Sequence, residues 1–141
     1  MYFKPLLLPL LAQVALSFIV MISMYRSRVT EIKSKNIHSQ KINTRSKSKE
    51  HLTDSAPAAD NYSNLFELPV LFYTAILLTL ILMVQDSILV TLAWAFVVTR
   101  YLHSFIHVTY NLVMHRFSVF LFSSFVLLAY WIRLGWIIIQ S

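Results

Sequence analysis

Two groups of polar residues interrupt apolar stretches of this sequence at helical spacing. Asn64 and Glu67 are three residues apart at the start of one stretch, and Arg100, His103 and His107 follow one another at steps of four or fewer in another. Residues spaced in this way share one face of a helix. A Glu inside an apolar segment must find hydrogen-bond donors, and two histidines four residues apart could bind a metal ion or a haem.

The composition is that of an integral membrane protein. Hydrophobic residues make up 57% of the 141 positions, and the mean hydropathy is +0.65. Charged residues are 13% of the chain, against about 25% in soluble domains. The chain has no cysteine, which excludes disulfides, thiolate metal sites and a cysteine nucleophile. Its length leaves room for four membrane spans with short connections and no further domain.

Four apolar segments predict four membrane-spanning helices, at about residues 6–25, 62–85, 88–108 and 117–139. The polar link at residues 85–87 is short, so the second and third helices should form an antiparallel hairpin. The sequence therefore predicts an all-α four-helix bundle in the membrane, with up-down-up-down topology.

Residues 26–60 form a basic connection between the first and second spans. Eight of the twelve Lys and Arg residues lie between Arg26 and Lys49, within a formal net charge of +6. Such a cluster favours a cytoplasmic loop that contacts anionic membrane lipids rather than nucleic acid, with both chain termini on the opposite side. We expect residues 36–59 to be largely disordered, with Ala56-Pro57-Ala58 breaking any helix.

The alternating topology brings the ends of spans one and three to the same depth as the starts of spans two and four. Glu67 is expected to pair with Arg100, because each charge alone is costly inside a span. Arg26 and Arg116, taken alone, are more often flanking residues at the lipid headgroups, and Arg133 should reach the opposite interface. The polar residues that can converge at the cytoplasmic end are Arg26, Asn64, Glu67, Arg100, His103, His107 and Arg116.

Two interpretations of the polar stripe on the third span follow from the residues alone. His103 and His107 could hold a metal ion or contribute to a haem site, although neither Asp nor Glu accompanies them on that span. Alternatively, the stripe only sets helix register in a structural or scaffolding membrane protein.

A third interpretation comes from a family resemblance. The run Asn64-Leu65-Phe66-Glu67-Leu68-Pro69, followed by Arg100-Tyr101-Leu102-His103 and later by Arg116, resembles the MAPEG family, the membrane-associated proteins in eicosanoid and glutathione metabolism. The similarity covers most of residues 60–131 and looks closest to bacterial members, which implies the bacterial inner membrane. It also implies a homotrimer of four-helix protomers, a glutathione site between protomers near the cytoplasmic face, and a lipophilic small-molecule substrate.

The resemblance implies a role for each matching residue. Asn64 and Glu67 match the family's second-helix pair, and Arg100 with His103 matches its third-helix Arg-x-x-His pattern. Arg116 matches the arginine that stabilises the glutathione thiolate, a catalytic role, because a guanidinium beside a thiol lowers the thiol pKa from about 8.5. The residues expected to bind glutathione are Arg26, Asn64, Glu67, Arg100, His103, His107 and Tyr110, and no metal is expected.

The chain also departs from the family pattern. Asp60 and Ser63 stand where eukaryotic members carry arginines, and His107 stands where the family has a tyrosine, with Tyr110 three residues further on. Fewer cations are therefore left for the carboxylates of glutathione. The predicted function is a glutathione-dependent transferase or peroxidase acting on lipophilic electrophiles, with a non-catalytic lipid-binding or scaffolding protein as the alternative.

Overall fold

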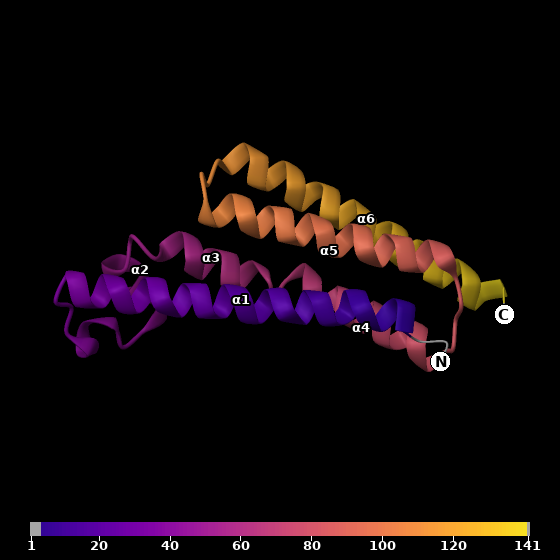
Figure 1. Ribbon diagram of the computed structural model, residues 1–141, viewed down its shortest axis with the longest axis horizontal. Coiled ribbons are helices and arrows are strands. Elements are labelled where there is room, and N and C mark those ends of the chain that lie inside the picture. The colour runs from indigo at the N-terminus through magenta and orange to yellow at the C-terminus, as the bar shows by residue number, and fades with distance from the viewer. Residues whose placement is uncertain (1–3, 141) are drawn as a thin grey trace.

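The four apolar segments form long helices, and a break divides the second of them. The computed structural model describes residues 4–140 (Figure 1). Its helices are α1 (Lys4–Ser34), the 3-10 helix η1 (Ser39–Ile42), α2 (Arg45–His51), α3 (Ala56–Asn64), α4 (Leu68–Ile81), α5 (Ser87–Val108) and α6 (Val113–Gln140). Four segments are long and apolar enough to cross a membrane, Pro5–Ser34, Ala56–Ile81, Ser87–Val108 and Val113–Gln140, which confirms the predicted all-α membrane fold.

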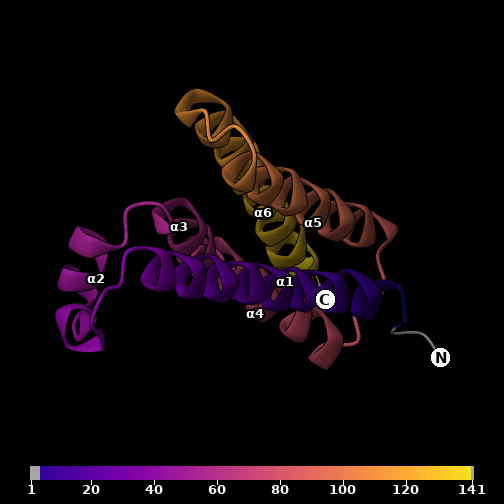
Figure 2. The ribbon, with the colours of Figure 1, turned by 60° about the vertical axis from the view of Figure 1, so that its left-hand side comes forward.

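The helices alternate in direction along the bundle. In Figure 1 both chain ends lie at the right, whereas α2, the start of α3 and the α5–α6 turn lie toward the left. Figure 2 shows η1 and α2 gathered at the end of α1 that is far from the N-terminus. The topology therefore places the basic connection and the polar ends of α3 and α5 at the same end of the molecule.

The core joins α4, α5 and α6. Phe72 stacks on Phe96 with ring centres 4.7 Å apart, and the hydroxyls of Thr79 and Tyr130 share a hydrogen bond of 2.9 Å. These four side chains are almost completely buried. Large apolar side chains such as Ile81 remain exposed on the outer surface, where lipid chains would solvate them.

Pro69 determines where the second span breaks. The apolar pattern predicts one helix over residues 62–85, but α3 ends at Asn64 and α4 begins at Leu68, with Pro69 in its first turn. Proline has no amide hydrogen, and its ring disfavours a helical conformation in the preceding residue. A helix can therefore begin at Pro69 more easily than continue through it. The break leaves the Asn64 carbonyl available to a side-chain donor.

The basic connection is folded, which corrects the expected disorder of residues 36–59. It contains η1, α2 and the start of α3, and Pro57 lies in the first turn of α3 instead of breaking it. Glu31 of α1 anchors this segment and is 3% exposed. Its carboxylate accepts hydrogen bonds from the Asp54 amide at 2.9 Å, the Ser55 amide at 2.8 Å, the Ser55 hydroxyl at 2.7 Å and the Lys35 ammonium at 2.6 Å. Ser55 is the N-cap of α3 and makes no side-chain cap bond, so Glu31 caps α3 from a different helix.

Asp86 closes the opposite end of the bundle. Its Oδ1 accepts the Leu89 amide at 3.0 Å, so Asp86 is the N-cap of α5, and its Oδ2 accepts Nη2 of Arg133 at 2.7 Å and Nε at 3.2 Å. Burial raises the pKa of the Asp86 carboxyl, but the hydrogen bonds from Arg133 and Leu89 outweigh it and hold that pKa below its ordinary value of 3.8. Arg133 therefore pairs with Asp86 within the bundle, a partner that the sequence pattern did not indicate.

Replacing Asp86 by asparagine is expected to lower the free energy of unfolding by about 0.5–1.5 kcal/mol at neutral pH. Asparagine is an equally good N-cap, so the loss isolates the ion pair with Arg133. Because the folded-state pKa of Asp86 is depressed, the difference from wild type should be full above pH 3.8 and disappear as the pH falls through the lower folded-state pKa. Thermal unfolding of both proteins in detergent across this pH range measures the difference in stability. A difference that grows toward acid pH would contradict the ion pair between Asp86 and Arg133.

Candidate functional site

Arg100 is the buried cation of the candidate site. Its side chain is fully buried, and Nη2 donates to the Asn64 carbonyl at 3.2 Å. Nε and Nη1 of Arg100 have no hydrogen-bond partner in the described part of the chain. The predicted ion pair with Glu67 is not formed, since Glu67 is exposed at the start of α4 and makes no salt bridge among residues 4–140. The break before Pro69 explains the difference, because it presents a backbone carbonyl to Arg100 instead of a carboxylate.

A network of polar side chains connects α3 with the polar stripe of α5. The Asn64 amide nitrogen lies 3.2 Å from Nε2 of His107, and the Ser104 hydroxyl donates to Oδ1 of Asn61 at 3.1 Å. Asn61, Ser104 and His107 are all at most 5% exposed. The structure therefore confirms that Asn64 and His107 lie together, and it adds Asn61 and Ser104. Their spacing could have identified them, since Asn61 precedes Asn64 by three residues and Ser104 follows Arg100 by four.

The two histidines take part in this network as hydrogen-bonding groups. Nδ1 of His103 lies 3.2 Å from the Arg116 carbonyl, and the rings of His103 and His107 meet edge to face with centres 5.0 Å apart. Among residues 4–140, no third His, Cys, Asp or Glu joins them in a group that could hold a metal ion. The arrangement ties α5 to the start of α6 and so positions Arg116.

Three of the predicted site residues line one cavity, which we call the polar cavity. It has a volume of about 390 Å³ and is lined by Lys49, Asp60, Ser63, Asn64, Glu67 and Arg116. Nη1 of Arg116 donates to Oδ1 of Asn111 at 2.7 Å, whereas its Nε is buried without a hydrogen-bond partner among the described residues. Asn111 lies in the α5–α6 turn with a φ of 48°, a left-handed conformation that asparagine tolerates well. The polar cavity thus combines two cations with two carboxylates.

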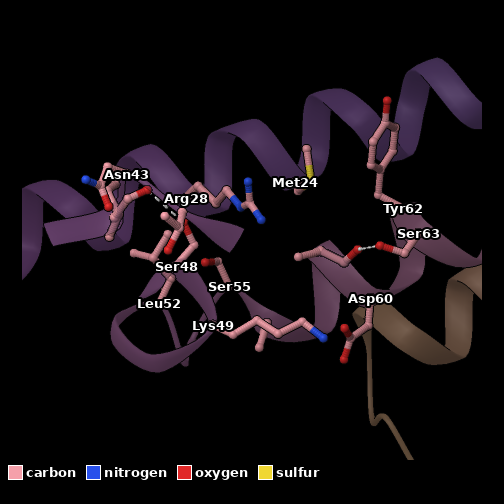
Figure 3. Close-up of a pocket in the computed structure, with 14 residues that line it drawn as sticks. Met24, Arg28, Asn43, Ser48, Lys49, Leu52, Ser55, Asp60, Tyr62 and Ser63 are labelled. Carbon is pink, nitrogen blue, oxygen red and sulfur yellow. Dashed lines mark hydrogen bonds between the residues drawn. The ribbon is translucent and has the colours of Figure 1, made fainter. Parts of the chain in front are cut away.

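Lys49 is a cavity residue that sequence reasoning did not identify. It belongs to α2, in the segment expected to be disordered, and it lines the polar cavity together with Asp60. Figure 3 shows its ammonium directed toward the Asp60 carboxylate. The folded connection therefore brings a cation to Asp60 and Ser63, the two positions at which this chain lacks the arginines of the pattern that it resembles.

Two predicted site residues, Arg26 and Tyr110, lie outside both the polar cavity and the network between α3 and α5. Arg26 is exposed on α1 and lines a separate cavity with Ile19, Ile22 and Ser23. Tyr110 is 51% exposed in the α5–α6 turn, and its hydroxyl lies 3.3 Å from Nδ1 of His115. Within one protomer the structure therefore does not bring these two side chains to Asn64, Glu67 and Arg116.

Comparison with known proteins identifies the family. The model of the MAPEG family matches residues 6–136, a stretch that reaches into all four apolar segments and includes every residue that lines the polar cavity. No curated protein and no solved structure shows significant similarity to the chain. The match extends over nearly the whole sequence and agrees with the four membrane-spanning segments of the fold. The chain therefore belongs to the MAPEG family.

Proposed function

We propose that this protein is a glutathione-dependent transferase or peroxidase that acts on lipophilic electrophiles. The observation that carries the proposal is the polar cavity, in which Asn64, Glu67 and Arg116 come together from α3, the α3–α4 break and α6. Family membership supports glutathione as the ligand, and the cavity supplies the groups that such a ligand needs.

The charges of the polar cavity complement those of glutathione. The tripeptide carries two carboxylates and one ammonium group, and the cavity offers the cations Lys49 and Arg116 beside the carboxylates Asp60 and Glu67. Its volume of about 390 Å³ lies within the range of about 300–1,000 Å³ that is usual for small-molecule sites. Lys49 and Arg116 would therefore hold the carboxylates or the sulfur, and Asp60 and Glu67 the ammonium.

Arg116 is suited to stabilise an anion. Asn111 holds one arm of the guanidinium by a 2.7 Å bond, while Nε keeps a free N–H among the described residues. Arg116 also lies in the first turn of α6, where the unpaired amides of the helix add partial positive charge. A bound thiol supplies the nucleophile, and these two electrostatic effects would lower its pKa toward neutrality.

The proposal includes a homotrimer in the bacterial inner membrane, with the basic connection on the cytoplasmic side. A neighbouring protomer could bring Arg26 or Tyr110 to the site, since neither reaches the polar cavity in its own protomer. Membrane lipids and a lipophilic substrate would contact the apolar outer surface. Mass measurement in mild detergent tests the assembly, and a stable monomer would remove the intersubunit part of the site.

A second candidate function, lipid binding without catalysis, is favoured by one other cavity. It has a volume of about 370 Å³ and an almost entirely apolar lining between α1 and the α3–α4 break. The residues that line it are Val14, Ser17, Phe18, Met21, Tyr62, Leu65, Phe66 and Tyr73. Such a surface suits an acyl chain, which could be either a substrate or a permanently bound lipid.

Calorimetric titration of the detergent-purified protein with glutathione tests the main proposal. We expect saturable binding, and we expect Glu67→Gln to weaken it by about tenfold or more, because a charge-assisted hydrogen bond contributes about 1.5–3 kcal/mol. Glu50→Gln is the matched control, since Glu50 is exposed on α2 and does not line the polar cavity. Absence of binding to an intact assembly would favour the lipid-binding function.

A further inference from the structure

A second polar cavity lies beneath the folded basic connection, and we call it the loop cavity. It has a volume of about 480 Å³ between α1, the segment from η1 to α2, and α3 (Figure 3). Its apolar walls come from Met24, Ile42, Leu52 and Tyr62. The same cavity carries cations and neutral polar groups, so it suits a ligand that has both an anionic and an apolar part.

Arg28 gives the loop cavity an uncompensated positive charge. Its guanidinium points into the cavity, and its Nε is buried without a hydrogen-bond partner among residues 4–140 (Figure 3). Asp60 is the one carboxylate of the lining, and Lys49 is directed toward it. The charged lining therefore consists of two cations and one carboxylate, and Arg28 keeps N–H donors for an anionic ligand. Arginine's planar fork matches the oxygens of a phosphate group.

The depth of Arg28 in the membrane indicates where such a ligand comes from. The apolar run of α1 from residue 6 to 25 is about 30 Å long as a helix, the thickness of the hydrocarbon core. Arg28 follows Tyr25 by three residues, which places it about 4.5 Å further along the helix, at the level of the lipid headgroups. Many of the chain's cations lie in the same connection, between Arg26 and Lys49.

We propose that the loop cavity binds the phosphate-bearing headgroup of an anionic phospholipid. Arg28 binds the phosphate, Asn43 and Ser48 offer polar contacts to the rest of the headgroup, and the apolar walls receive the beginning of the acyl chains. This site goes beyond the proposed function, because it takes a different ligand in a cavity that lacks Asn64, Glu67 and Arg116. A free phosphate ester shares the same chemistry, and the test separates the two sources.

Arg26 provides a matched control two residues away. Successive residues of a helix are turned by about 100°, so Arg26 and Arg28 point to different sides of α1. Arg26 is exposed and lines a cavity that shares no residue with the loop cavity. Arg26→Gln and Arg28→Gln therefore remove the same charge at nearly the same depth, and only Arg28→Gln removes a donor from the loop cavity.

The experiment is native mass spectrometry of the detergent-purified protein titrated with phosphatidylglycerol or phosphatidylcholine. We expect wild type to prefer phosphatidylglycerol by about tenfold, because both lipids carry the phosphate but only phosphatidylcholine adds a quaternary ammonium, which Arg28 and Lys49 would repel. Arg28→Gln should abolish the preference, Arg28→Lys should retain part of it, and Arg26→Gln should leave it unchanged. Ala59→Leu, which fills the loop cavity without changing the charge, should also abolish the preference.

Three results would overturn the proposal. If Arg26→Gln and Arg28→Gln lose the preference for phosphatidylglycerol to the same extent, the basic connection attracts anionic lipid without a specific site. If wild type shows no preference, no headgroup site exists. Displacement of phosphatidylglycerol by millimolar inorganic phosphate would assign the cavity to a water-soluble phosphate ester. Arg28→Gln should bind glutathione as wild type does, because Arg28 does not line the polar cavity. Failure of the lipid site is therefore distinguishable from failure of the proposed glutathione function.

Discussion

Replacement of Arg116 by alanine is expected to lower glutathione-dependent turnover by about 10²- to 10³-fold, the usual effect of removing one preorganised donor to a developing anion. The assembly should stay intact, because in the described residues the side chain of Arg116 donates one hydrogen bond, to Asn111, and takes part in no ion pair. The loss should appear in kcat and in the ultraviolet absorbance of the bound thiolate. Arg116→Lys should recover only part of the activity, because lysine keeps the charge and loses the fork.

Asn111→Gly tests how much the positioning of the Arg116 guanidinium contributes, because the guanidinium stays present while its hydrogen-bond acceptor is removed. Glycine accepts the φ of 48° at this position without strain, and the substitution removes the acceptor that holds Nη1 of Arg116. We expect a loss of turnover smaller than that of Arg116→Ala. The assay is conjugation of glutathione to a model electrophile in detergent. An Arg116→Ala protein with unchanged turnover would show that Arg116 does not stabilise the thiolate, and absence of turnover in wild type would favour lipid binding without catalysis.

The second large effect is expected at Glu31. Replacement by alanine should lower the free energy of unfolding of the basic connection by about 3–5 kcal/mol, because it removes the acceptor of four hydrogen bonds and leaves the Ser55 amide buried without a partner. The membrane helices should remain folded, since Glu31 lies beyond the apolar run of α1 and its carboxylate bonds only to residues 35, 54 and 55 in the described part of the chain.

Hydrogen exchange in detergent, with trypsin cleavage as a second measurement, resolves this local effect. In Glu31→Ala we expect faster exchange across residues 35–60 and new cleavage at Lys41 and Lys47, with α5 and α6 still protected. Glu50→Ala is the control, since it removes the same charge from an exposed position in the same segment. Unchanged exchange in Glu31→Ala would show that the connection folds without its carboxylate anchor.

The sequence predicted the parts of this molecule that depend on local pattern. The four spans follow from apolar runs, and the grouping of Asn64 with His107 follows from helical spacing and alternating topology. Prediction failed where a contact joins distant residues. Ser55 is 24 positions from Glu31, and Asp86 is 47 positions from Arg133, so no local spacing links either pair.

The expected pairing of Glu67 with Arg100 failed for a different reason. Charge complementarity and depth both favoured this pair. Pro69, however, breaks the helix after Asn64, and the break presents the Asn64 carbonyl to Arg100. Lys49 was missed because a segment rich in charged and polar residues predicts disorder unless a buried anchor is known. In both cases the deciding interaction involves the backbone or a single buried carboxylate, which residue patterns do not reveal.

The two cavities beneath the basic connection share part of one wall. Lys49, Asp60 and Ser63 line both the polar cavity and the loop cavity. A ligand that draws Lys49 toward one cavity would change the charge that remains in the other, so the two proposed binding equilibria would be coupled. Thermodynamic linkage makes such coupling reciprocal. If both proposed ligands bind, any factor by which a lipid headgroup weakens glutathione binding is the factor by which glutathione weakens lipid binding, and the lipid composition of the membrane would then set the affinity for glutathione.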